Sequence, residues 1–158
     1  GLIHYTQKSD LPEYTKTPHE NRWYFYVDLA MNTRESKEKT RRPNLILSGG
    51  AFRKVSGIIG LGGGVELAQD FAIPVQESRS ESLISGAYLE NHFLFGRFDF
   101  SQRLGKYLSK PEGYRASDAL FQRYTLTYLF GNHFSVGAGL KAHGHVAEYL
   151  DFRVGWQF

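Results

Sequence analysis

The alternation of apolar and polar residues, which runs with a period of two through most of the chain, constrains the fold more than any other feature. The last segment is the clearest, with polar residues or glycine between its apolar members Leu150, Phe152, Val154, Trp156 and Phe158. Successive side chains of a β-strand point to opposite faces, so this pattern gives a strand one apolar face. A helix would scatter the same residues around its axis. The chain is therefore predicted to be all-β.

Alternation of the same kind marks further segments along the chain. The regular ones cover residues 23–32, 59–68, 97–104, 123–130, 134–143 and 150–158. Two less regular segments, at 45–51 and 83–89, complete a set of about eight strands. Residues 22–158 are predicted to form a β-barrel, and residues 1–21 an N-terminal polar segment or the remnant of a strand. The barrel is expected either to be complete or to be part of a larger one.

Composition restricts the class of protein. The 158 residues include no cysteine, which excludes a disulfide framework and thiolate metal sites. A formal net charge of +3 is too small to indicate a nucleic-acid partner. The mean hydropathy is −0.41, and the sequence has no apolar run of about 18 residues for a transmembrane helix. A transmembrane barrel remains compatible with these values because its strands alternate polar and apolar residues.

The connections between the predicted strands alternate in length. Long polar connections are expected at 34–43, 70–81 and 109–118, and short ones at 54–57, 91–96 and 131–133. This order is typical of up-and-down antiparallel membrane barrels, which have short turns at the periplasmic end and longer loops outside. The connection at 146–148 is the exception, because it should be external and is short.

The apolar face could point outward to lipid or inward, as in a soluble barrel that binds a small apolar ligand. Glycines on the polar face, aromatic residues near the strand ends and the terminal Phe158 favour lipid outside. The lumen would then hold many charges, which must pair because an unpaired buried ion costs several kcal/mol. The expected members are Asp28, Glu66, Arg97, Asp99, Arg103, Arg123, Lys141, His143, His145, Asp151 and Arg153.

One group of residues suggests chemistry. Lys141, His143 and His145 are spaced two apart, and Glu148 follows them. Two histidines and a carboxylate could bind a metal or act in general base catalysis. The favoured interpretation is that they are hydrogen-bonded lumen residues, and no cofactor or metal is expected. A charged run at 35–42 is expected to be solvated surface, or to meet the phosphates of lipopolysaccharide.

Several stretches resemble the C-terminal part of PagL-type lipid A deacylase (acyloxyacyl hydrolase) barrels, in particular the larger Bacteroidota-type members. They are residues 95–105, 121–124, 139–143 and 147–158. The resemblance implies hydrolysis of an ester-linked acyl chain of lipid A, by a His and a Ser two residues apart in an H-x-S-N motif with an acidic partner. On that motif His143 matches the catalytic His and Glu148 approximates the acid, but His145 stands in place of the Ser. Without the hydroxyl no acyl-enzyme forms.

The function most consistent with these patterns is a non-catalytic barrel of the Gram-negative outer membrane, or a subunit of an outer-membrane assembly. Its expected partners are outer-membrane lipid and lipopolysaccharide, with other outer-membrane proteins as a further option. Two alternatives stay open: a lipid A deacylase, or its C-terminal half, and the soluble ligand-binding barrel. If the chain is enzymatic, its candidate catalytic residues are His143, His145 and Glu148.

Overall fold

A computed structural model describes residues 22–36, 39–73, 83–111, 114 and 118–158. Residues 1–21, for which we expect a polar segment, lie outside the described part. The strands are β1 (Trp23–Glu35), β2 (Arg41–Lys54), β3 (Ile59–Asp70), β4 (Leu83–Phe95), β5 (Phe98–Ser109), β6 (Leu120–Phe130), β7 (Phe134–His143) and β8 (Val146–Gln157). Within the described residues there is no helix with the length and apolarity needed to cross a membrane.

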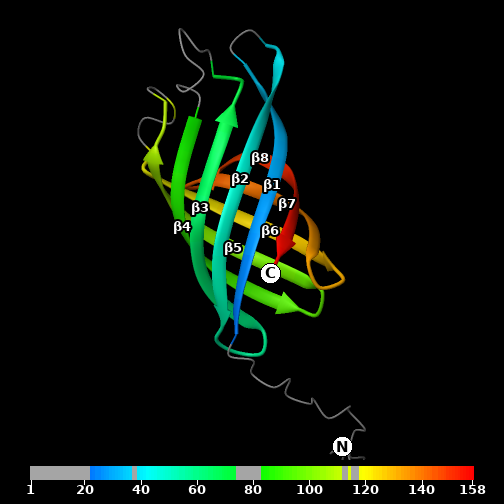
Figure 1. Ribbon diagram of the computed structural model, residues 1–158. Coiled ribbons are helices and arrows are strands. Elements are labelled where there is room, and N and C mark those ends of the chain that lie inside the picture. The colour runs from blue at the N-terminus through cyan, green and yellow to red at the C-terminus, as the bar shows by residue number, and fades with distance from the viewer. Residues whose placement is uncertain (1–21, 37–38, 74–82, 112–113, 115–117) are drawn as a thin grey trace, which may run out of the picture.

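The eight strands form one closed antiparallel barrel in sequence order (Figure 1). Each strand pairs with the next, and β1 also pairs with β8 over Tyr26–Met31. The prediction of an up-and-down barrel of about eight strands is therefore confirmed. The option that these strands belong to a larger barrel is wrong, because the first and last strands close the sheet on themselves.

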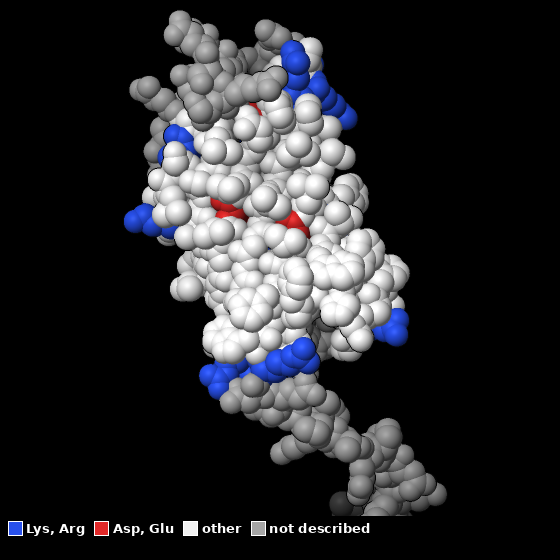
Figure 2. All heavy atoms as spheres, in the orientation of Figure 1, with Lys and Arg blue, Asp and Glu red and all other residues white. Residues whose placement is uncertain are grey.

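The barrel is apolar outside and polar inside, as predicted for a membrane barrel. Leu126 on β6 is 52% exposed, whereas its neighbour Arg123, three residues earlier, is fully buried. Among the described residues, sixteen polar or charged side chains are buried against nine hydrophobic ones. Figure 2 shows a broad, almost uncharged band across one face, with Lys and Arg side chains mainly along its borders. A soluble barrel would have the opposite arrangement, so the soluble alternative is wrong.

Two of the three predicted long connections are long, those between β3 and β4 and between β5 and β6, whereas the one predicted at 34–43 is only residues 36–40. Several other bounds also differ. The β4–β5 turn consists of Gly96 and Arg97 alone, because β4 continues through the residues predicted as a turn. The β7–β8 turn is Gly144 and His145, and the predicted connection at 146–148 belongs to β8. Both turns begin with a glycine at positive φ, 63° and 56°, which side-chain-bearing residues adopt rarely. As a result Arg97 and His145 are exposed turn residues, and their predicted placement in the lumen is wrong.

The apolar side chains inside the barrel gather at the long-loop end. Ile46 of β2 lies opposite Ala30 of β1 and Ala68 of β3, and Phe121 of β6 joins the same cluster. Gly105 stands beside the Phe121 ring, where a Cβ atom would overlap it. Small residues on the neighbouring strands therefore make room for one large ring, and this end of the lumen is filled.

Candidate functional site

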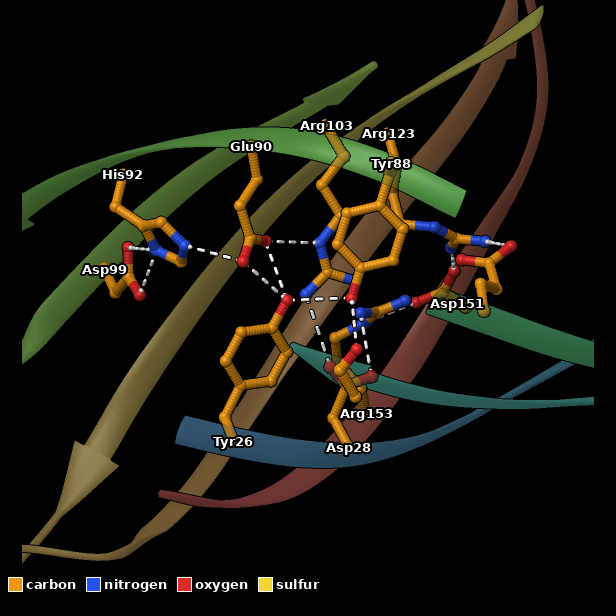
Figure 3. Close-up of polar contacts among 12 residues, drawn as sticks. Tyr26, Asp28, Tyr88, Glu90, His92, Asp99, Arg103, Arg123, Asp151 and Arg153 are labelled. Carbon is orange, nitrogen blue, oxygen red and sulfur yellow. Dashed lines mark hydrogen bonds and ion pairs between the residues drawn. The ribbon is translucent and has the colours of Figure 1, made fainter. Parts of the chain in front are cut away.

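The predicted charge pairing in the lumen takes the form of one continuous chain of ion pairs, which we call the lumen chain. It alternates acids and bases in the order Glu90, Arg103, Asp28, Arg153, Asp151, Arg123, Glu66 and Lys141. These residues come from every strand except β2. The chain holds four cations and four anions, so its formal charge is balanced. Figure 3 shows how most of its members converge across the barrel.

The contacts within the lumen chain are close and multiple. Arg103 donates from Nε to Glu90 at 3.0 Å and from Nη2 to Asp28 at 3.3 Å. Arg123 donates to Asp151 and, at 3.0 Å, to Glu66. Arg103 and Arg123 thus each join two carboxylates from other strands. Fork-shaped guanidinium groups suit this bridging, since they present several N–H donors in a fixed plane. The chain therefore connects strands through the middle of the barrel.

A second group lies at the short-turn side of the lumen chain, around His92 of β4. The His92 Nδ1 atom lies 2.8 Å from Asp99 Oδ2, and Nε2 lies 3.2 Å from Glu90 Oε1 (Figure 3). Its ring stacks on Phe52 with centroids 3.9 Å apart. The hydroxyl of Tyr26 donates to the Glu90 carboxylate at 2.7 Å. His92 and Glu90 did not emerge from the sequence, because β4 alternates less regularly than the other strands.

The third group, at the long-loop end, contains two of the predicted site residues. We call it the rim cluster, and its members are Arg34, Asp70, Tyr107, Tyr114, His143 and Glu148. The His143 Nε2 atom lies 2.6 Å from the Tyr107 hydroxyl, and Nδ1 lies 3.3 Å from Glu148 Oε2. The structure thus brings His143 and Glu148 together, whereas His145 lies in the exposed β7–β8 turn.

Glu148 reaches the lumen because of a β-bulge. Lys141 pairs with Tyr149 and Ala142 with Ala147, so Glu148 is an extra residue on β8. A bulge redirects a side chain that the regular alternation would place on the other face. The Glu148 side chain is 1% exposed as a result. Strand alternation alone would have placed it outside.

The Glu148 carboxylate contacts Arg34 and Tyr114 in addition to His143, and Arg34 is itself held by Asp70. Arg34 Nη2 lies 3.0 Å from Glu148 Oε1, and Arg34 also pairs with Asp70. The Tyr114 hydroxyl donates to Glu148 Oε1 at 3.0 Å. Burial and the adjacent carboxylate both raise the pKa of Tyr114, so its phenol stays a donor. The sequence missed Arg34 because it was assigned to a loop, and it missed Tyr107 because an aromatic residue was not expected in the lumen.

The rim cluster orders a hydroxyl, an imidazole and a carboxylate in series. That order is the one used by hydrolases in which histidine activates a nucleophile. Here the hydroxyl belongs to a tyrosine that is 9% exposed and lies inside the barrel. Within the residues that the structure describes, no group of three or more His, Cys, Asp or Glu side chains is arranged to hold a metal ion.

The fold and the charged lumen define an outer-membrane-type β-barrel. Residues 21–158 match the family model described as acyloxyacyl hydrolase, C-terminal domain. The match covers most of the chain, and the protein belongs to this family. The resemblance to PagL-type barrels that the sequence predicted is thereby confirmed.

Comparison with other known proteins adds little to this assignment. Curated proteins give no significant match. Among solved structures, a chain from work described as de novo design of transmembrane β-barrels is 10% identical, with a TM-score of 0.46 over 87% of this chain and 94% of that one. A de novo designed barrel solved by NMR in solution is 9% identical, with a TM-score of 0.45 over 85% and 91%.

Proposed function

We propose that this protein is a structural, non-catalytic barrel of the bacterial outer membrane, with its long loops outside the cell and its short turns in the periplasm. The observation that carries the proposal is the placement of His143 and Glu148. Both side chains are buried inside the lumen and are held there by Tyr107, Tyr114 and Arg34. Residues engaged in this way hold strands together across the barrel.

The same placement separates the rim cluster from a lipid substrate. The acyl chains of a lipid lie against the exterior of a membrane barrel, and the ester to be cleaved must reach the nucleophile. The hydroxyl bonded to His143 Nε2 belongs to Tyr107, on the inner face of β5. The lipid-facing surface of β5 carries Leu104 and Leu108, which are 54% and 67% exposed. The barrel wall thus stands between the His143 imidazole and the lipid.

Ester hydrolysis is the second candidate, because the family is that of acyloxyacyl hydrolases and because of one geometric observation. The Tyr107 hydroxyl, His143 and Glu148 form a series with distances of 2.6 and 3.3 Å. In this mechanism His143 would take the phenolic proton and the Tyr107 oxygen would attack the ester carbonyl. The lipid alcohol would leave with the proton held by His143, and water would then hydrolyse the aryl ester to the free acid and restore the phenol. This chain would act either alone or as the C-terminal part of a deacylase.

Mass spectrometry of lipid A distinguishes the two candidates. Cells that express this chain alone are expected to show unchanged lipid A acylation, equal to that of cells expressing Tyr107→Phe and His143→Ala. The Tyr107→Phe variant removes one oxygen atom and keeps the ring that packs against Phe121. Loss of an acyl chain that is abolished by both substitutions would contradict the structural proposal and establish the hydrolase.

Lipopolysaccharide is the partner that we propose for the long-loop end. Lys39, Arg41 and Arg42 are exposed there, and cationic side chains near an anionic membrane surface contribute about 1 kcal/mol each. Phosphate groups of lipopolysaccharide would meet these cations in the outer leaflet. The apolar exterior would also allow this barrel to serve as a subunit of a larger outer-membrane assembly.

A further inference from the structure

One part of the barrel exterior departs from the apolar rule. It lies on β4, β5 and β6, which are neighbours in the wall (Figure 1). Outward positions there carry amide or phenol side chains, which we call the amide patch: Asn91, Gln102, Gln122 and Tyr124. Strand pairing brings them together, because Gln102 lies opposite Asn91 on one side and Tyr124 on the other. The Tyr124 hydroxyl donates to Gln122 Oε1 at 3.1 Å.

The two ends of β5 locate the patch relative to the membrane. Near the short turns Phe98 packs against Tyr128, with ring centroids 5.0 Å apart. Aromatic side chains of this kind lie at the membrane interface of barrels. Gln102 is four residues from Phe98 and seven from Ser109, which is about 13 and about 23 Å along the strand. The patch therefore lies between the two interfaces, within the apolar band.

The opposite wall of the barrel has no such group. β1 is four strands away from β5 in either direction around the barrel. Midway along β1, Leu29 lies opposite Leu47 of β2 and Val154 of β8. Each of these three side chains is 48% exposed. The outward side chains of β1 are apolar from Trp23 to Met31, so the amide patch is confined to one side of the exterior.

Amide groups are poorly suited to lipid. Gln102 is exposed, and no side-chain hydrogen bond joins it to another of the described residues. Hydrocarbon offers no hydrogen-bond partner, and an unsatisfied polar group in it costs several kcal/mol. Polar side chains at membrane depth therefore mark contacts with protein or water rather than with lipid. The surface around Gln102 thus has the chemistry of a protein contact.

We propose that a second copy of this chain docks on the β4–β6 face within the membrane. An amide both donates and accepts, so Gln102 of one copy can pair with Gln102 of the other across a two-fold axis. Leu89 and Leu104 lie beside it, 73% and 54% exposed, and supply apolar contact. The patch itself has no charged residue. Lys106, the outward cation of β5, lies four residues toward the long loops and can extend to the headgroups.

Self-complementarity favours a second copy over a different protein. A two-fold contact requires one surface that fits itself, and neutral amides with surrounding leucines meet this requirement without repulsion. Amide side chains join transmembrane helices in the same way. The inference rests on the proposed placement in the outer membrane. It does not depend on whether the rim cluster, which lies inside the lumen, is catalytic.

Cross-linking in native membranes tests the contact. The chain has no cysteine, so single-cysteine variants report on one position each. In the outer-membrane fraction, a short bifunctional thiol reagent should join Leu104→Cys into a covalent dimer and leave Leu47→Cys, on the opposite wall, monomeric. Equal cross-linking of both variants, or cross-linking of Leu104→Cys to a different protein, would overturn the proposal. Absence of the chain from that fraction would contradict the membrane placement itself, and this inference with it.

Sedimentation equilibrium of the full chain in detergent micelles measures the strength of the contact. Gln102→Leu removes the amide at an outward position, where it does not disturb the lumen, and should weaken the dimer about tenfold. Gln102→Asn keeps an amide and should weaken it less. Leu29→Ala, on the opposite wall, should leave the dissociation constant unchanged. A dimer insensitive to Gln102→Leu, or a chain that is monomeric in micelles and not cross-linked in membranes, would overturn the proposal.

Discussion

The two ends of the lumen differ in how they are filled. At the long-loop end Ile46, Phe121 and Tyr107 pack together beneath the rim cluster. At the short-turn end the lumen contains a cavity between Phe52 and the arginines of the lumen chain. The barrel has eight strands along its whole length. The size of the side chains inside it therefore determines why one end is filled and the other is not. A small barrel can therefore be packed like a protein core at one end and contain a cavity at the other.

The largest expected effect comes from breaking the lumen chain that separates the two ends. Arg123→Met removes the cation between Asp151 and Glu66 and leaves their charges only partly compensated. We expect the free energy of unfolding to fall by about 3–5 kcal/mol, the range for removing one partner of a buried ion pair. Urea unfolding of the barrel in lipid vesicles, followed by tryptophan fluorescence, measures this change.

A matched pair of variants separates charge from packing in that experiment. Arg123→Met combined with Asp151→Asn should recover part of the lost stability, because the second change removes an uncompensated charge. Arg97→Met in the exposed turn should change stability by less than about 0.5 kcal/mol, as surface substitutions usually do. Equal destabilisation by Arg97→Met and Arg123→Met would show that the lumen chain does not connect the strands energetically.

A smaller effect should distinguish the packed end from the open one. Ile46→Ala removes a fully buried side chain from the apolar cluster and should cost about 2–4 kcal/mol. Leu94→Ala, at the wall of the cavity, should cost about 1 kcal/mol, because the leucine already borders open space. Similar losses in the free energy of unfolding for the two variants, measured by the same urea unfolding, would contradict a difference in packing between the two ends.

The smallest effect concerns the outer surfaces of the two ends. Replacing Arg41 and Arg42 by Gln should weaken binding of lipopolysaccharide by about 1 kcal/mol per charge, with little change in stability. The measurement is titration of purified lipopolysaccharide into the barrel in neutral detergent. Arg53→Gln, at the short-turn end, should bind as the unaltered protein does. A stronger loss with Arg53→Gln would reverse the proposed orientation of the barrel.

The sequence predicted the strands and their faces well because one physical rule governs both. A strand with one face in lipid must place an apolar residue at every second position, as β8 does from Leu150 to Trp156. The same rule placed Arg103, Arg123 and Arg153 in the lumen, and the structure confirms all three. It also required their charges to pair, although it did not specify which strands would supply the partners.

The sites were predicted less well because they depend on departures from the rule. The bulge at Glu148 turns inward a side chain that simple alternation does not place, and the glycine turn at 144–145 removes His145 from the lumen. Tyr107 was missed because its phenol looks apolar in a pattern, whereas its hydroxyl contacts His143. Strand register and local irregularity, which arise from contacts between distant segments, decide such details.

The pairing of β1 with β8 also determines when the barrel can form. The contact joins Tyr26 to Gln157 and Met31 to Phe152, which are separated by nearly the whole described chain. The β1–β2 pairing extends over Trp23–Glu35, whereas the β1–β8 pairing, the seam of the barrel, covers only Tyr26–Met31. Closure of the seam carries the greatest entropy cost of any strand pairing and must await the last strand to be synthesised. Until then the sheet has two open edges, and the ion pair of Asp28 with Arg153 is unmade.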